Sequence, residues 1–142
     1  QETGTSVSRG VELITRYELN EQFFAAANVS WNPTQRSNGL PRLRRPENLM
    51  NLALGWKNTT GRFQAQSSYR LVRNTLDEAN NTILELDDFS VLDLNASVKM
   101  NKHLTAYSRI ENLLNEKYEE VAGYNMPGAS VHFGFNMTLA GM

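Results

Sequence analysis

Carboxylate and imidazole side chains are the groups in this sequence that could take part in catalysis or hold a metal ion. Glu12 and Glu18 could act as an acid–base pair, but they stand six residues apart in a stretch with strand periodicity. That spacing corresponds to about 20 Å along a strand, which is too far for a glycosidase pair of carboxyl groups. His103 and His132 have no further ligands at the spacing of a metal site. We therefore expect no metal site.

The common catalytic motifs are absent from the sequence. It contains no His-Glu-x-x-His, no Gly-x-Ser-x-Gly and no phosphate-binding glycine loop. The acidic pairs Asp77-Glu78 and Asp87-Asp88 lack the regular oxygen spacing of a calcium loop, so we interpret them as solvated loop charges. These observations predict a protein that is not an enzyme and that needs no cofactor.

The composition excludes several further classes of protein. The chain has 142 residues, enough for one domain, and a net charge of −1. Because there is no basic excess to neutralise phosphates, we expect no nucleic-acid binding. The absence of Cys removes disulfide scaffolds, thiol catalysis and Cys-based zinc sites. No apolar run approaches the roughly 20 residues of a membrane-spanning helix. The N-terminus is not a signal peptide, so we interpret the chain as an internal or C-terminal piece of a longer protein.

Apolar residues alternate with polar ones through most of the chain, and this period of two is typical of β-strands with two unlike faces. In the first such stretch Val11, Leu13 and Tyr17 alternate with Glu12 and Arg16. The seven stretches are 11–19, 23–31, 50–56, 63–71, 92–100, 104–110 and 131–139. Their apolar phase contains no charged residue, whereas the opposite phase contains charges of both signs. We therefore predict an all-β fold with about seven strands.

Short and long connections alternate between these stretches. The short links are 20–22, 57–62 and 101–103. The long links are 32–49, 72–91 and 111–130. Antiparallel strands with short turns at one end and long loops at the other form an up-and-down meander, and outer-membrane barrels show this asymmetry. A strand of nine or ten residues, tilted by about 40°, spans roughly 25 Å, which is the height of the apolar band on such barrels.

Aromatic residues of the apolar phase lie toward the ends of the stretches, with Ala, Leu and Val between them. Such rings favour the headgroup layer of a membrane, so this pattern predicts a lipid-facing aromatic girdle. The predicted girdle residues are Tyr17, Phe23, Trp31, Trp56, Phe63, Tyr69 and Phe133. Alternation does not say which face is inside, so a soluble β-sandwich or small binding barrel with an inward apolar face remains an alternative. Seven strands cannot close an even-numbered barrel, so the membrane interpretation requires further strands.

The last third of the chain carries residues with a family resemblance. Residues 112–118 read NLLNEKY, and Gly123-Tyr124, Pro127-Gly128 and an alternating strand follow. This order resembles the C-terminal end of the TonB-dependent outer-membrane receptors, and loosely their cobalamin and siderophore branch. The segments RGVE at 9–12 and Arg44-Arg45-Pro46 are similar to strand-opening elements of the same family. One departure is Leu139, which stands where the family usually ends its last strand with an aromatic residue.

The resemblance implies that residues 1–142 form the C-terminal part of a 22-stranded transmembrane β-barrel, without the plug domain and the N-terminal strands. It places the protein in the bacterial outer membrane with a periplasmic C-terminus, in contact with membrane lipid and lipopolysaccharide. The implied function is active uptake of a scarce ligand, such as an iron–siderophore or cobalamin, with energy from TonB acting on a plug and box that lie outside this chain. A passive outer-membrane channel, in which the lumen charges set ion preference, is the second interpretation.

The resemblance also assigns roles to individual residues. The predicted lumen-facing charges are Arg16, Glu18, Arg70, Asp93, Lys99 and Arg109. The predicted substrate contacts, all in long loops, are Arg42, Arg44, Arg45, Tyr118 and Tyr124. Arg and Tyr are residue types that anchor recognition surfaces. Alternatively, Arg44 and Arg45 bind rim carboxylates or lipopolysaccharide phosphates, and Tyr118 and Tyr124 order the last loop.

Overall fold

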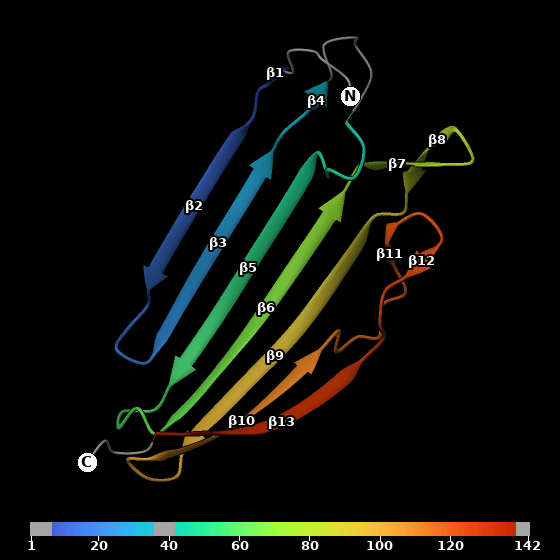
Figure 1. The fold of residues 1–142 in the computed structure, drawn as a ribbon. Helices are drawn as coiled ribbons and strands as arrows, with labels where there is room; N and C mark the ends of the chain where they lie inside the picture. Colours follow the sequence, from blue (N-terminus) through green and yellow to red (C-terminus); the bar gives the residue numbers. More distant parts are fainter. Residues whose placement is uncertain (1–6, 36–41, 139–142) are drawn as a thin grey trace.

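A computed structural model describes residues 7–35 and 42–138, and in this part of the chain every regular element is a β-strand (Figure 1). One antiparallel sheet has the order β13-β10-β9-β6-β5-β3-β2. Its seven long strands therefore follow one another in the sheet in the same order as in the chain. Its members are β2 (Val11–Glu18), β3 (Phe23–Trp31), β5 (Asn48–Lys57), β6 (Phe63–Arg73), β9 (Phe89–Lys99), β10 (Leu104–Glu111) and β13 (Ser130–Met137). The predicted all-β meander is confirmed. Leu139 lies outside the described residues.

The structure also contains short strand pairs that the alternation pattern did not predict: β1 precedes β2, and the other short strands lie in the long connections. These strands are β1 (Val7–Ser8), β4 (Thr34–Gln35), β7 (Thr75–Ala79), β8 (Thr82–Leu86), β11 (Glu119–Val121) and β12 (Tyr124–Asn125). The β7–β8 pair turns at Asn80 and Asn81, with φ of 52° and 60°. Both values are those of a type I′ hairpin turn, in which Asn is favoured. The described residues contain no helix long and apolar enough to cross a membrane.

Cross-strand register brings all seven apolar phases to the same face of the sheet. One complete row runs through Tyr17, Ala25, Leu54, Ser67, Leu94, Ile110 and Val131. Large side chains on this apolar face remain open to the surroundings, and Phe133 is 79% exposed. Nothing in the described part of the chain packs against it as a second sheet. The described residues therefore contain no inward-facing apolar core of the kind a soluble sandwich has, and an exposed apolar face of this kind is typical of a site that contacts a membrane or another protein.

The opposite face, here called the polar face, carries charges, amides and hydroxyls. The adjacent row runs through Glu18, Phe24, Gly55, Gln66, Asn95, Arg109 and His132. On this face the ring of Phe24 lies over Gly55, and the guanidinium of Arg16 lies 3.7 Å from the centre of the ring. Tyr107 of β10 covers Gly134 of the edge strand β13 in the same way. These rings fill the space that a glycine leaves in a strand.

The three short turns lie at one end of the sheet and the long connections at the other (Figure 1). Each short turn is closed by the side chain of an asparagine. Asn20, Asn58 and Asn101 each accept a hydrogen bond from the backbone N–H of the residue that begins the next strand, at 2.9–3.0 Å. This local bond is the one that makes Asn a preferred turn residue. The end of the sheet with the short turns is here called the plain end, and the end with the long connections is called the elaborated end.

Candidate ligand-contact surface and inner wall

A buried carboxylate organises the elaborated end. Asp77 on β7 has 0% exposed surface. Its Oδ1 accepts hydrogen bonds from Arg44 Nε and from the backbone N–H of Glu78, both at 2.8 Å. Its Oδ2 accepts one from the backbone N–H of Ala122, also at 2.8 Å. The interpretation of Asp77 as a solvated loop charge is therefore wrong, because tertiary contacts from two other connections enclose it.

These donors also set the acidity of the group. The backbone N–H of Ala122 and the side chain of Arg44 lower the pKa of Asp77 below its ordinary value of 3.8, although burial acts in the opposite direction. Hydrogen bonds to a carboxylate favour its charged form. Asp77 is therefore an anion at every pH near neutrality, and it attracts the donors of both neighbouring connections.

Arg44 reaches Asp77 from an unusual backbone conformation. Its φ is 58°, in the left-handed region that residues other than Gly, Asn and Asp rarely adopt. Its backbone N–H donates to the carbonyl of Leu76 at 2.7 Å, and its side chain forms the ion pair with Asp77. Such a conformation persists where surrounding contacts determine it. Arg44 is thus held by contacts with the β7–β8 hairpin, although its side chain remains 59% exposed.

The last connection, 112–129, begins with a compact turn built on two asparagines. Asn112 is 3% exposed, and its side chain bonds the backbone of Glu116 and the carbonyl of Pro127. Asn115 Oδ1 accepts from the backbone N–H of Ala129 at 3.0 Å, and a Cβ on Gly128 would lie 2.5 Å from that oxygen. Both asparagines have positive φ. The NLLN and Pro-Gly segments therefore form one structural unit, which closes the two ends of the connection onto each other.

This connection then folds back over the polar face. Tyr118 is 8% exposed and stacks on Phe89 of β9, with ring centres 4.2 Å apart. Val72 and Val91 complete the small buried cluster. The hydroxyl of Tyr118 lies 3.4 Å from Arg70 Nη2, and burial raises the pKa of Tyr118 above its ordinary value of 10.0. The largest apolar cluster at this end thus lies on the polar face of the sheet, beneath the last connection.

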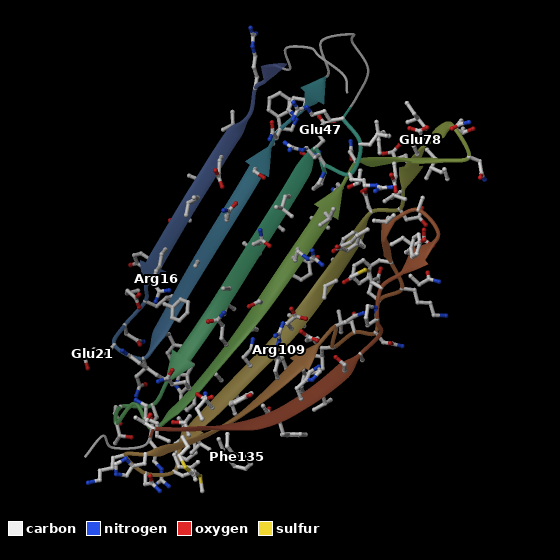
Figure 2. All side chains as sticks on the ribbon, in the orientation of Figure 1. Arg16, Glu21, Glu47, Glu78, Arg109 and Phe135 are labelled. Atoms are coloured by element: carbon white, nitrogen blue, oxygen red, sulfur yellow. The ribbon has the colours of Figure 1, made fainter. Side chains whose placement is uncertain are left out.

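The predicted substrate contacts do not form one cluster. Arg44 is engaged with Asp77, Tyr118 is buried against Phe89, and Tyr124 is 72% exposed on β12. Arg45 is exposed and Arg42 is half-buried. The exposed members Arg45 and Tyr124 follow the Asp77 partners Arg44 and Ala122 by one and two residues in the sequence. Glu47 and Glu78 also lie at this end, and Glu21 lies at the plain end (Figure 2).

The predicted lumen charges all share the polar face, and four of the six take part in ion pairs. Arg16 Nε bonds Glu18 Oε1 at 2.8 Å along one strand. Arg70 pairs with Glu120 at 2.8 Å, and Arg109 pairs with Glu111. The remaining two members are placed by register and contact: Asp93 accepts the backbone N–H of Asn112, and Lys99 stands opposite Thr105. Figure 2 shows Arg16 and Arg109 on strands far apart in the sheet. One of these ion pairs joins two of the predicted charges, and the other two join Arg109 to Glu111 of β10 and Arg70 to Glu120 of the last connection.

The predicted girdle residues all lie on the apolar face. Phe23 and Trp56 are direct cross-strand neighbours with ring centres 6.5 Å apart. Trp31 Nε1 donates to Glu47 Oε1 at 3.0 Å, so this ring has the polar partner that an aromatic at an apolar–polar boundary uses. The exposed fractions of Tyr17, Phe63 and Phe133 are 69%, 46% and 79%. No group of three or more metal-binding side chains occurs within residues 7–35 and 42–138.

Comparison with known families decides the identity of this sheet. The family model described as "TonB dependent receptor-like, beta-barrel" matches residues 1–113. The chain belongs to this family. TonB-dependent receptors are receptors and transporters of the outer membrane rather than enzymes. The match ends before most of the last connection, which resembles the same family through NLLNEKY.

Solved structures of TonB-dependent receptors share the fold. The chain is similar to the copper transporter OprC, with a TM-score of 0.79, 16% identity and coverage of 92% of this chain and 23% of that one. It is also similar to the ferripyoverdine receptor of the outer membrane of Pseudomonas aeruginosa bound to ferripyoverdine, with a TM-score of 0.74, 14% identity and coverage of 92% and 19%. For a chain of the FpvAI–pyocin S2 complex the TM-score is 0.77 and the identity 14%, with coverage of 92% of this chain and 19% of that one. The chain thus spans about a fifth of the length of these relatives.

Proposed function

We propose that this chain is the C-terminal part of the barrel wall of an active outer-membrane transporter, with its external loops. In this proposal residues 1–142 contribute the last strands of a 22-stranded barrel whose plug domain and earlier strands lie outside the chain. The observation that supports it most strongly is the uncharged apolar face that runs in register through seven strands. An apolar band of this kind is what a lipid bilayer requires of a barrel exterior.

The proposed orientation follows from the asymmetry of the two ends. Outer-membrane barrels have short periplasmic turns and long external loops. The turns at Asn20, Asn58 and Asn101 then lie in the periplasm with the C-terminus, and the end with Asp77 faces outward. The girdle residues contact lipid, and exposed basic residues such as Arg45 are available to lipopolysaccharide phosphates or to a ligand.

We further propose that the transported ligand is a metal chelate or a similar scarce compound, moved with energy that TonB transmits to the plug. The relatives in the comparison bind ferripyoverdine or transport copper. The polar face would then surround the plug. Four of its six predicted lumen charges take part in ion pairs, which suits contact with a hydrated protein surface. Exposed Tyr124 and Arg45 are the proposed ligand contacts on this part of the rim.

Uptake by the full-length receptor tests this function. A Gram-negative host lacking its own siderophore and cobalamin receptors would express the full-length protein, and accumulation of labelled ferric siderophores, cobalamin and copper would be measured with and without a functional TonB. Active transport predicts uptake of one ligand class that disappears without TonB. Uptake that is equal in both hosts would show a passive channel instead.

A further inference from the structure

Three connections that are distant in the sequence depend on one another through Asp77. The carboxylate receives Arg44 from one connection and the backbone N–H of Ala122 from another, while Asp77 itself belongs to the β7–β8 hairpin. A buried carboxylate is costly unless donors compensate it. Displacing either neighbouring connection would therefore leave the charge poorly satisfied, and each connection holds the others in place.

Backbone contacts reinforce the same arrangement. Arg44 N–H donates to Leu76 O at 2.7 Å, and Glu47 N–H donates to Asn74 O at 3.1 Å. Arg44 keeps a left-handed φ of 58° that has no local reason in an arginine. A free loop would relax from this conformation, so its presence indicates that the contacts to the hairpin determine the loop.

A second set of contacts anchors the last connection to the sheet. Tyr118 stacks on Phe89, and Glu120 pairs with Arg70 of β6 at 2.8 Å. The guanidinium of Arg70 lies 5.3 Å from the ring centre of Phe89 and 6.0 Å from that of Tyr118. The last connection is thus held at Ala122 by the hairpin and at Tyr118 and Glu120 by the polar face. A segment fixed at both positions cannot swing outward without breaking both sets of contacts.

We propose that residues 42–47, 74–88 and 112–129 form one preassembled surface, here called the Asp77 platform, which is assembled before any ligand arrives and which the last connection anchors to the polar face. This proposal rests on the proposed function only in placing the platform on the outer side of the barrel. It makes this sector of the opening a fixed wall and not a mobile lid. Asp77 is its positioning residue: it is fully buried and acts by holding the connections that carry Arg45 and Tyr124.

Hydrogen–deuterium exchange tests the platform without any ligand. The full-length receptor in lipid nanodiscs would be compared with Asp77→Asn and with Asp87→Asn, a matched removal of one exposed carboxylate charge from the same connection. We expect slow exchange at Ala122 in the wild type and in Asp87→Asn. In Asp77→Asn we expect exchange there to rise by about tenfold or more, as the loss of a charged hydrogen bond implies. Fast exchange at Ala122 in the wild type, or no change in Asp77→Asn, would overturn the proposal.

A distance measurement covers the case in which Asp77→Asn does not assemble. Spin labels would be placed at exposed Glu85 and Lys117 through Glu85→Cys and Lys117→Cys, in a chain that has no cysteine of its own. A single narrow distance distribution in the ligand-free receptor supports the platform, and a broad or bimodal one overturns it. The uptake assay is separate from both measurements, so a receptor with no transport but a rigid platform would refute the function and leave this inference standing.

Discussion

The ring of Phe24 covers Gly55 on the neighbouring strand so closely that a Cβ at Gly55 would lie 1.9 Å from Phe24 Cε1. Arg16 then stacks on the outer side of the same ring, 3.7 Å from its centre, and pairs with Glu18. Three adjacent strands are thereby connected on the polar face by side chains as well as by backbone hydrogen bonds. The ring of Phe24 occupies the space that a side chain at Gly55 would need.

Gly55→Ala is therefore expected to destabilise the barrel by about 1–3 kcal/mol, the usual cost of forcing extra volume into a packed site. The double variant Gly55→Ala with Phe24→Ala should recover part of that loss, because the ring no longer occupies the space. Urea unfolding of the purified full-length receptor in detergent would measure both. Equal stability of Gly55→Ala and wild type would contradict the packing described here.

The two faces of the sheet predict opposite responses to a new charge. Leu54 is 61% exposed on the apolar face, and Gln66 stands on the polar face opposite Gly55. Leu54→Arg should cost about 2–4 kcal/mol in a lipid-facing position, whereas Gln66→Arg should cost little. The folded fraction on heat-modifiability gels of outer membranes would show the difference. If Gln66→Arg were the more damaging of the two, the assignment of lipid and lumen faces would be reversed.

Asn112 should be the most sensitive residue of the last connection. Its side chain makes three hydrogen bonds to the backbone of Glu116 and Pro127. At roughly 1 kcal/mol for each bond, Asn112→Ala should destabilise the local turn by about 3 kcal/mol. Protease cleavage at exposed Lys117 would then accelerate strongly, because cleavage follows the population of the open form. Leu114→Ala, at a side chain that is 63% exposed, is the control and should leave the cleavage rate nearly unchanged.

Acid should open the elaborated end only below the ordinary range of aspartate. The pKa of Asp77 is lowered in the folded protein by the N–H of Ala122 and by Arg44. Its contribution to stability is therefore present in full above the unfolded value of 3.8 and is lost as the pH falls through the lower folded value. The distance between labels at Glu85 and Lys117 should stay constant from pH 8 to about 5 and should broaden only below that unfolded value. Broadening near pH 6 would show that another group controls the assembly.

Much of the sheet could be read from the sequence because its determinants are local. Alternation marks each strand and each face, and an asparagine opens each short turn. The family segment NLLNEKY also contains Asn112, whose side-chain hydrogen bonds lie within the last connection. These features need no knowledge of which strands are neighbours.

The contacts of Asp77 could not be read in the same way. Its partners Arg44 and Ala122 lie 33 and 45 residues away, and no alternation or spacing links them. One local signal was available. Asn80-Asn81 indicates a hairpin turn, and the pairing places Asp77 opposite Leu84 and on the same face of the hairpin as Leu86, which pairs with Thr75. A carboxylate on the apolar face of a hairpin is a sign of a buried contact. The cover of Gly55 by Phe24 likewise depends on register, which one sequence does not fix.

The asparagine-closed turns have a consequence for the order in which this segment folds. Each joins two strands that are adjacent both in the chain and in the sheet, so the β2–β3, β5–β6 and β9–β10 hairpins have low contact order and can form early from local information. The elaborated end requires loop closure over 33 to 45 residues and must wait for those hairpins to align. We therefore expect nucleation to begin at the short turns, which lie on the periplasmic side in the proposed orientation, and the surface at the other end to form last.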